Sequence, residues 1–160
     1  MLNLATVFEY SAQNNPDKTA IVFGEKTFTF GQTLAMVNQI ANGLKQKGIR
    51  KGDKVALSCL NLPYFPLVYY AILKAGAVVV PLNVLLKARE IEYHLKDSEA
   101  RAYVCFQGTP ELPMAEEGFK GFQGTEGCEQ FYVITADPAA ASPIEGVPTL
   151  GQLMAGQPFQ

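Results

Sequence analysis

One acidic side chain and the one histidine of this chain have the spacing of two metal ligands. Glu90 and His94 stand four residues apart in the segment EIEYH, with Glu92 between them, so a helix would place the first and last on one face. A metal site needs three or four ligands, and the chain has no other histidine. We therefore favour a solvated helix face carrying an internal Glu–His pair.

The remaining candidate groups also lack partners. Ser58 and Ser98 could act as nucleophiles only beside an oriented base, and no sequence context supplies one. The glycine-rich segment Gln107–Gly127 contains Lys120, but no hydroxyl residue follows this lysine as in a phosphate-binding loop. The glycine spacing matches neither of the common phosphate-binding patterns. This segment is expected to be a flexible surface connection.

An aromatic group could form the wall of a ligand pocket. Tyr64, Phe65, Tyr69 and Tyr70 lie close together in an apolar segment. Between two apolar strands, such a group more often packs in the core than against a ligand. The motifs alone therefore predict no catalytic, cofactor-binding or metal-binding residue within residues 1–160.

Composition indicates one globular domain. The 160 residues are 48% hydrophobic and 18% charged, which excludes a disordered chain. The net charge of −2 provides no electrostatic attraction for nucleic acid or for an anionic membrane. Cys59, Cys105 and Cys128 form an odd set without a close pair, which favours buried thiols in a reducing, cytoplasmic compartment.

No targeting or membrane-spanning segment is expected. The N-terminal residues MLNLATVFEYSAQ lack a basic stretch and contain Glu9 where an apolar run would have to continue. The most apolar window, residues 65–82, is interrupted by two prolines, a lysine and a glycine. It is too broken for a membrane span of about 20 apolar residues, so it predicts a buried helix followed by a buried strand.

Helical and strand patterns alternate along most of the chain. Strands that are apolar on both faces, separated by helices, predict an α/β fold with three layers: a largely parallel sheet flanked by helices, with a small β-hairpin attached. The expected elements of the first part are a helix from about Leu4, the hairpin strands Ala20–Phe23 and Lys26–Thr29, and a helix that begins with a Thr29–Gln32 capping box and ends at Gly48. The strand Val55–Leu60 follows, then a helix that runs to Ala75 and ends at Gly76, and then the buried strand Ala77–Val80. The last expected elements are the helix Ala88–Ser98 and the strands Ala102–Phe106 and Phe131–Thr135.

The C-terminal part is expected to complete a single domain, residues 1–160. Residues 136–148 are rich in proline and alanine and resemble a linker. They lead to a short apolar run, Leu150–Met154.

One long stretch resembles a known family. NLPYFPLVYYAILKAGAVVVPLN, followed by EIEYHLKDSEARAYV, is similar to the early region of the adenylate-forming superfamily, which includes acyl-CoA synthetases, luciferases and the adenylation domains of peptide synthetases. Its signature corresponds here to Leu73–Asn83. FTFGQTLAMVNQIANGLKQKGIRKGDKVAL and the final TLGQLMA also resemble this family. Two departures are Val84, where proline is common, and the glycine-rich segment, where the family is more helical.

The resemblance implies the N-terminal subdomain of an ATP-dependent acyl-CoA ligase. Such an enzyme uses ATP, Mg²⁺ and CoA to convert a carboxylic acid to an acyl-adenylate and then to a thioester. The family's phosphate loop ending in Pro-Lys-Gly, its Tyr-x-x-Thr-Glu motif, its ribose-binding aspartate and its C-terminal lysine do not occur in residues 1–160. We therefore expect the 160-residue chain to be cut short of its active site, to bind no cofactor and to be inactive by itself.

Substrate and assembly are less constrained by the resemblance. A medium- or long-chain fatty acid is the favoured substrate, with aryl acids as the second choice. The alternative function is a non-enzymatic module that binds an acyl group or another protein. Apolar surface left uncovered by missing segments could produce a homodimer.

Overall fold

A four-stranded parallel sheet forms the centre of the molecule. The structure is a computed structural model that describes residues 3–160, and Met1 and Leu2 lie outside the described residues. The strands are β3 (Lys54–Ser58), β4 (Val78–Pro81), β5 (Ala100–Phe106) and β6 (Gln130–Ile134), in the order β4-β3-β5-β6. Every neighbouring pair is parallel, which confirms the predicted sheet.

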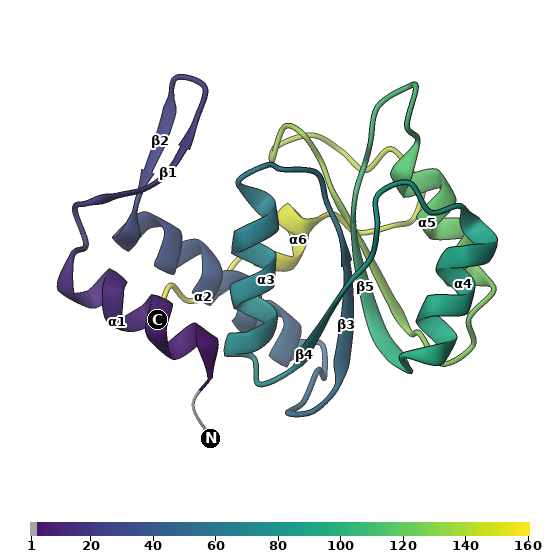
Figure 1. Cartoon of the computed structure of the whole chain (residues 1–160), viewed down its shortest axis with the longest axis horizontal. Helices are drawn as coiled ribbons and strands as arrows, with labels where there is room; N and C mark the ends of the chain where they lie inside the picture. The colour runs from purple at the N-terminus through teal and green to yellow at the C-terminus, as the bar shows by residue number, and fades with distance from the viewer. Residues whose placement is uncertain (1–2) are drawn as a thin grey trace.

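Helices cover both faces of this sheet (Figure 1). On one side α2 (Phe30–Gln46) packs against α3 (Tyr64–Lys74), and on the other α4 (Ala88–Asp97) packs against α5 (Met114–Gln123). The N-terminal helix α1 (Leu4–Asn14) lies outside α2 and α3, and the short α6 (Leu150–Met154) packs between α2 and β6. The three-layer α/β architecture expected from the sequence is therefore confirmed.

The small hairpin is also confirmed. Strands β1 (Thr19–Phe23) and β2 (Lys26–Thr29) pair antiparallel, and Figure 1 shows them projecting from the body of the molecule. Thr29 Oγ1 accepts a hydrogen bond from the Gln32 backbone N–H, and the Gln32 side chain accepts one from the Thr29 N–H. This capping box begins α2 directly after the hairpin and so fixes where the hairpin leaves the core.

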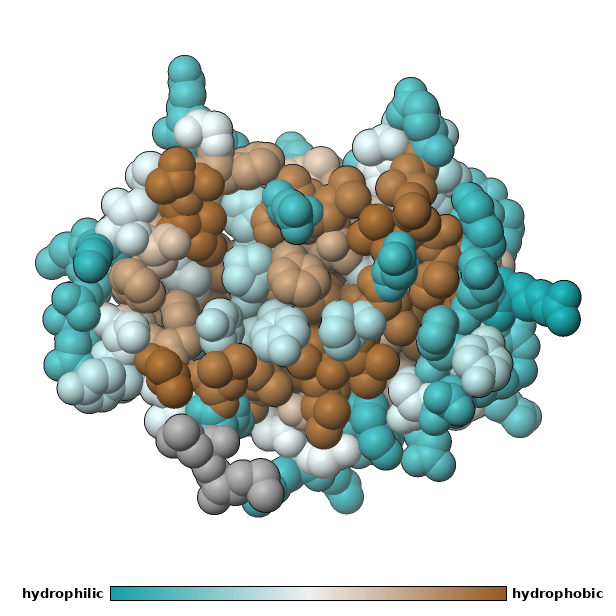
Figure 2. Space-filling view, in the orientation of Figure 1, coloured by the Kyte–Doolittle hydropathy of each residue, from teal (hydrophilic) through white to brown (hydrophobic). Residues whose placement is uncertain are grey.

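The prediction that residues 77–80 form a buried strand is wrong in part. Ala77 is buried, but β4 is an edge strand, and Val78 is 48% exposed. Figure 2 shows apolar surface across the face on which α3 and β4 lie. A run of valines predicts a strand, yet it cannot distinguish a central position from an edge, because that depends on which partners the tertiary fold supplies.

The prediction of a flexible connection over residues 107–127 is wrong. Its central part is the helix α5, packed on α4 and on β5. Gly118 and Gly121 are three residues apart on the buried side of α5, where a Cβ atom would meet Cys105 Sγ at 3.0 Å and Ile91 Cγ2 at 2.8 Å, respectively. The absence of a side chain at these two glycines allows α5 to pack closely against its neighbours. They therefore indicate close helix packing and not a flexible loop.

The segment that follows β6 has no helix or strand until α6 begins. Residues 136–148 run back along the edge of the sheet, and the Val133 N–H donates to the carbonyl of Pro148 at 3.0 Å. Thr149 then caps α6 together with Gln152. The linker character of this segment and the unity of residues 1–160 as one domain remain predictions.

Gly76 adopts the left-handed conformation that its place after α3 requires. Its φ is +82°, and a Cβ atom built there would lie 3.4 Å from Lys51 Cβ, an ordinary contact. Because the surroundings have room, the cost of a side chain is conformational. Gly76→Val is expected to lower the free energy of unfolding by about 1–2 kcal/mol in denaturant melts. An unchanged midpoint would contradict this account of the signature glycine.

Candidate functional site

The histidine and the glutamates of α4 do not form a site. The Glu90 carboxylate accepts a hydrogen bond from the Lys87 backbone N–H at 2.9 Å and so helps to cap the helix. Glu92 pairs with Lys96 one turn further along. Across residues 3–160 the structure shows no hydrogen bond or ion pair between Glu90 and His94, so the expected internal pair is wrong. In the same residues no group of three or more His, Cys, Asp or Glu side chains could hold a metal ion.

The two candidate serines have structural roles. Ser58 is buried at the end of β3, and its Oγ lies 2.7 Å from the Tyr103 hydroxyl, which is also buried. Burial raises the pKa of the Tyr103 phenol well above its usual value, so this pair stays uncharged. Ser98 Oγ donates to the Leu95 carbonyl at 3.4 Å near the C-terminus of α4. Within residues 3–160 the structure shows no hydrogen bond from either serine to a basic side chain.

The three cysteines are free, buried thiols. Burial raises the pKa of Cys59, of Cys105 and of Cys128 from 9.0 to about 12 in each case. A thiolate is the reactive form of cysteine, so none of the three is activated as a nucleophile.

These shifts predict sensitivity to alkali. The unfolded chain loses the thiol protons near pH 9, whereas the folded chain keeps them to about pH 12. The folded state therefore binds more protons in this window, and the free energy of unfolding falls as the pH rises. Stability is expected to be constant from pH 7 to 8.5 and to decline steadily from about pH 9. Urea melts in a pH series test this, and a triple Cys→Ala variant should show a smaller decline.

Lys120 is not placed to bind phosphate. It lies on the exposed side of α5, and its Nζ donates to the Glu116 carboxylate at 2.9 Å. The glycines around it are either in the buried face of α5 or in separate turns, so they do not form one loop of converging N–H groups.

The aromatic group of α3 divides between the core and a cavity. Tyr70 stacks on Phe8 of α1 with ring centroids 4.6 Å apart, and Tyr69 packs against Phe65 and Tyr70, as expected for packing residues. Tyr64 behaves differently. Its hydroxyl donates to the Ala136 carbonyl at 3.1 Å, and its ring lines an apolar cavity.

This cavity lies at the carboxyl ends of the parallel strands. Its volume is about 450 Å³, and we name it the hairpin cavity because strands β1 and β2 form one wall. The loop after β3 contributes Leu62 and Pro63, β5 contributes Phe106, and the segment after β6 contributes Ala136 and Pro138. The remaining lining residues are Phe23, Lys26 and Phe28 of the hairpin, Met36 of α2, and Tyr64 and Leu67 of α3.

The topology explains why a cavity opens here. In the sheet, β3 lies between β4 and β5. The chain leaves β3 through α3 on one face of the sheet, and it leaves β5 through α5 on the opposite face (Figure 1). Ligands of open α/β sheets bind at such a switch point, beyond the carboxyl ends of the strands. The sequence interpretation identified Tyr64 but missed the hairpin and Phe106. The predicted ends of the strands could have indicated Phe106 as a cavity residue, because parallel strands bring their carboxyl ends to one edge of the sheet.

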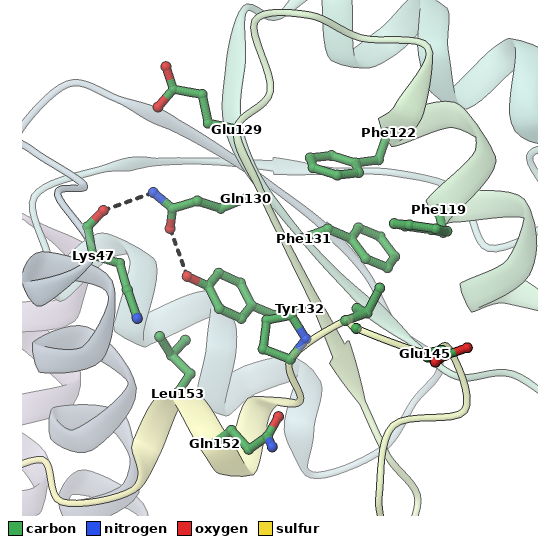
Figure 3. Close-up of a pocket in the computed structure, with 13 residues that line it drawn as sticks. Lys47, Phe119, Phe122, Glu129, Gln130, Phe131, Tyr132, Glu145, Gln152 and Leu153 are labelled. Atoms are coloured by element: carbon green, nitrogen blue, oxygen red, sulfur yellow. Dashed lines mark hydrogen bonds between the residues drawn. The ribbon is translucent and has the colours of Figure 1, made fainter.

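A second hollow lies along the outer edge of β6 (Figure 3). It has a volume of about 670 Å³ and is more open to solvent. Phe119, Phe122 and Phe131 form a cluster on one side, with ring centroids 5.4–6.0 Å apart. On the other side the Gln130 side chain bridges Tyr132 and the Lys47 carbonyl. The Gln130 amide and the Tyr132 hydroxyl are therefore occupied by contacts within the protein.

Comparison with known proteins identifies the family. The sequence pattern of the AMP-binding enzyme family matches residues 8–149. The chain therefore belongs to the AMP-binding enzyme family, whose members form adenylates. This confirms the resemblance noted in the sequence.

Relatives that match include proteins named as CoA ligases. A long-chain-fatty-acid–CoA ligase of Bacillus subtilis is 38% identical over 101 residues, covering 63% of this chain and 18% of that protein. A 3-hydroxybenzoate–CoA ligase of an Aromatoleum species is 37% identical over 90 residues, covering 56% of this chain and 17% of that protein. The chain thus matches about one fifth of the length of such relatives.

Solved structures agree on the fold. An anthranilate CoA ligase in complex with anthranoyl-AMP superposes with a TM-score of 0.84 at 30% identity, covering 99% of this chain and 29% of the other. A protein described as a putative long-chain-fatty-acid CoA ligase from Rhodopseudomonas palustris gives a TM-score of 0.79 at 25% identity, covering 99% and 38%. In residues 3–160 no helix is long and apolar enough to cross a membrane.

Proposed function

We propose that residues 1–160 form the N-terminal subdomain of an ATP-dependent acyl-CoA ligase. In this reaction a carboxylate attacks ATP to give an acyl-adenylate and pyrophosphate, and the CoA thiol then displaces AMP to give the thioester. The observation that carries the proposal is the family match across residues 8–149, on a sheet whose carboxyl edge holds an apolar cavity at the switch point.

The favoured substrate is a medium- or long-chain fatty acid, and aryl acids are the second choice. The apolar lining of the hairpin cavity and the name of the Bacillus subtilis relative support the fatty acid. The names of the hydroxybenzoate and anthranilate ligases support the aryl acid. Fold alone does not decide between these substrates.

Residues 1–160 are proposed to provide structure and not catalysis. Binding of a triphosphate needs several converging N–H groups and cations. Lys120 is paired with Glu116, and the described residues hold no cluster suited to Mg²⁺. The residues present therefore do not fit an ATP–Mg²⁺ site, and we assign them no step of the reaction. The free, buried thiols support a reducing, cytoplasmic location.

Titration of the 160-residue chain with ATP–Mg²⁺ tests this division of roles. We expect no heat of binding at micromolar concentrations and no carboxylate-dependent release of pyrophosphate. A longer chain that includes the family's phosphate loop and C-terminal lysine should release pyrophosphate with fatty acids. Micromolar ATP affinity in the 160-residue chain would overturn the proposed division and direct attention to the glycines of residues 107–127.

The alternative is a non-enzymatic module that binds an acyl group or another protein. The hairpin cavity is the observation that favours it, because an apolar cavity can bind a ligand without catalysing a reaction. If the longer chain releases no pyrophosphate with any carboxylic acid, this alternative replaces the enzyme.

A further inference from the structure

The segment that follows α6 is bound along α2. Residues 157–160, which we name the tail, have neither helix nor strand, and Figure 1 shows them leaving α6 toward α2. Three side chains of α2 donate to the main-chain oxygens of all four tail residues, and we name these three the amide row. The bonds, each from a side-chain amide nitrogen to a main-chain oxygen, are Asn38 to Phe159 at 2.6 Å, Gln39 to Gln157 at 3.3 Å, and Asn42 to Pro158 and to Gln160 at 3.0 Å each.

The amide row contacts the main chain of the tail. Phe159 is 63% exposed, and Pro158 and Gln160 are exposed as well, so these side chains bury little surface. Among the hydrogen bonds of residues 3–160, one involves a tail side chain, that of Gln157 with Gln46. Every residue has a main-chain carbonyl, so a neutral amide donor can bind this group in any sequence.

Asn38 also carries an acceptor that fits a peptide group. The residue is 6% exposed, and its Oδ1 atom is buried and accepts no hydrogen bond from residues 3–160. The same carboxamide therefore offers one donor, which is bonded to Phe159, and one unpaired acceptor. A peptide group has the matching pair, a C=O and an N–H, whereas a carboxylate has acceptors only. The site is therefore suited to a peptide main chain.

The helix α6 needs support beyond its own hydrogen bonds. Its five residues are too few for a helix that is stable alone. A cavity of about 80 Å³ lies beside it, lined among others by Met36 and Ile40 of α2 and by Met154 of α6. At Gly43, by contrast, the backbones of the two helices come so close that a Cβ atom would collide with the Leu153 carbonyl oxygen. Contact between α6 and α2 is therefore close at one point and incomplete beside it.

We propose that the amide row is a recognition site for a peptide main chain, and that the tail bound there holds α6 against α2. The main-chain oxygens of the tail provide the binding, and its side chains contribute little. Because the tail follows α6 directly, a bound tail restricts how far α6 can move from α2. This inference depends on contacts within residues 36–160 and not on the proposed substrate or reaction.

Phe159→Trp makes binding of the tail measurable. The chain has no tryptophan, and Phe159 is largely exposed, so the change places a single fluorophore on the tail without disturbing the core. In time-resolved anisotropy of the 160-residue chain, a bound tail should rotate mainly with the whole protein, whereas an unbound tail should add a faster decay. A decay dominated by the fast component would overturn the proposal.

Asn42→Asp tests the amide row in this reporter chain. The change is nearly isosteric, but a carboxylate has no donor and would face two main-chain oxygens. Loss of the two hydrogen bonds should shift the ratio of bound to unbound tail at least tenfold toward the unbound form. Asn61→Asp, the same change in the exposed loop before α3, is the matched control and should leave the tail bound. Equal anisotropy in the two variants would overturn the proposal.

A double variant tests whether the main chain is what the site binds. Gln157→Ala with Gln160→Ala removes two tail side chains, including the contact with Gln46, and leaves every main-chain oxygen in place. The ratio of bound to unbound tail should stay within about threefold of the reporter chain. If this variant releases the tail as fully as Asn42→Asp does, the side chains provide the binding and the proposal fails.

Hydrogen exchange tests whether the tail holds α6. The Leu153 and Ala155 N–H groups each donate to the carbonyl four residues earlier, so their exchange measures the opening of α6. Asn42→Asp should speed this exchange by about the factor by which it releases the tail, while the amides of β3 and β5 exchange as in the parent. Asn61→Asp should change neither. Unchanged exchange in α6 with the tail released would overturn the proposal, and so would an equal rise in β3 and β5, which would indicate global unfolding.

Discussion

Gly121→Leu is expected to lower the free energy of unfolding by roughly 3 kcal/mol, at the upper end of the cost of overpacking a core. A Cβ atom at Gly121 would lie 2.8 Å from both the Ala88 carbonyl oxygen and Ile91 Cγ2. The first of these is a backbone atom at the start of α4, so the contact can be relieved only by moving the two helices apart.

Helix propensity opposes this effect but is smaller. Replacing a glycine inside a helix by a better helix former gains at most about 1 kcal/mol. The steric conflict should therefore decide the sign. Gly127→Leu is the matched control, because no atom lies within 4 Å of a Cβ built there and its φ is not in the left-handed region. Urea melts should show Gly127→Leu within about 0.5 kcal/mol of the parent. Equal stability of the two variants would mean that α5 does not pack on α4 as described.

Tyr103→Phe is expected to cost about 2 kcal/mol, although it removes only one oxygen atom. Tyr103 is fully buried, and its hydroxyl lies 2.7 Å from the Oγ atom of Ser58, a residue that is 3% exposed. Removing the phenol oxygen leaves the serine hydroxyl buried without a partner, and water cannot reach it to compensate. The penalty therefore comes from the group that remains.

The double variant makes this argument testable. Ser58→Ala in the Tyr103→Phe background removes the stranded hydroxyl and should recover most of the lost stability. A double-mutant cycle in urea should give an interaction energy of about 1–2 kcal/mol between the two positions. If the two single costs simply add, the hydroxyls are not bonded to each other.

Local chemistry determined much of this fold. The Thr29–Gln32 capping box, the glycine after α3 and the apolar runs of β3, β5 and β6 each specify an element through contacts within a few residues, so they could be predicted. Parallel pairing followed from strands that are apolar on both faces and alternate with helices. The signature Leu73–Asn83 pointed to the family because several such local requirements occur there in a fixed order.

The tertiary structure decided what depends on partners distant in sequence. The glycines in residues 107–127 suggested a loop, but Gly118 lies against β5 and Gly121 lies against α4. Because these two residues have no side chain, the backbone of α5 can pack close to both neighbours while remaining helical. The three valines of β4 are compatible with a central strand or with an edge strand, and only the strand order of the folded sheet places β4 at the edge. The hairpin cavity gathers residues from Phe23 to Pro138, more than 110 positions apart. No local pattern encodes such a meeting, because it arises where the carboxyl ends of the strands come together.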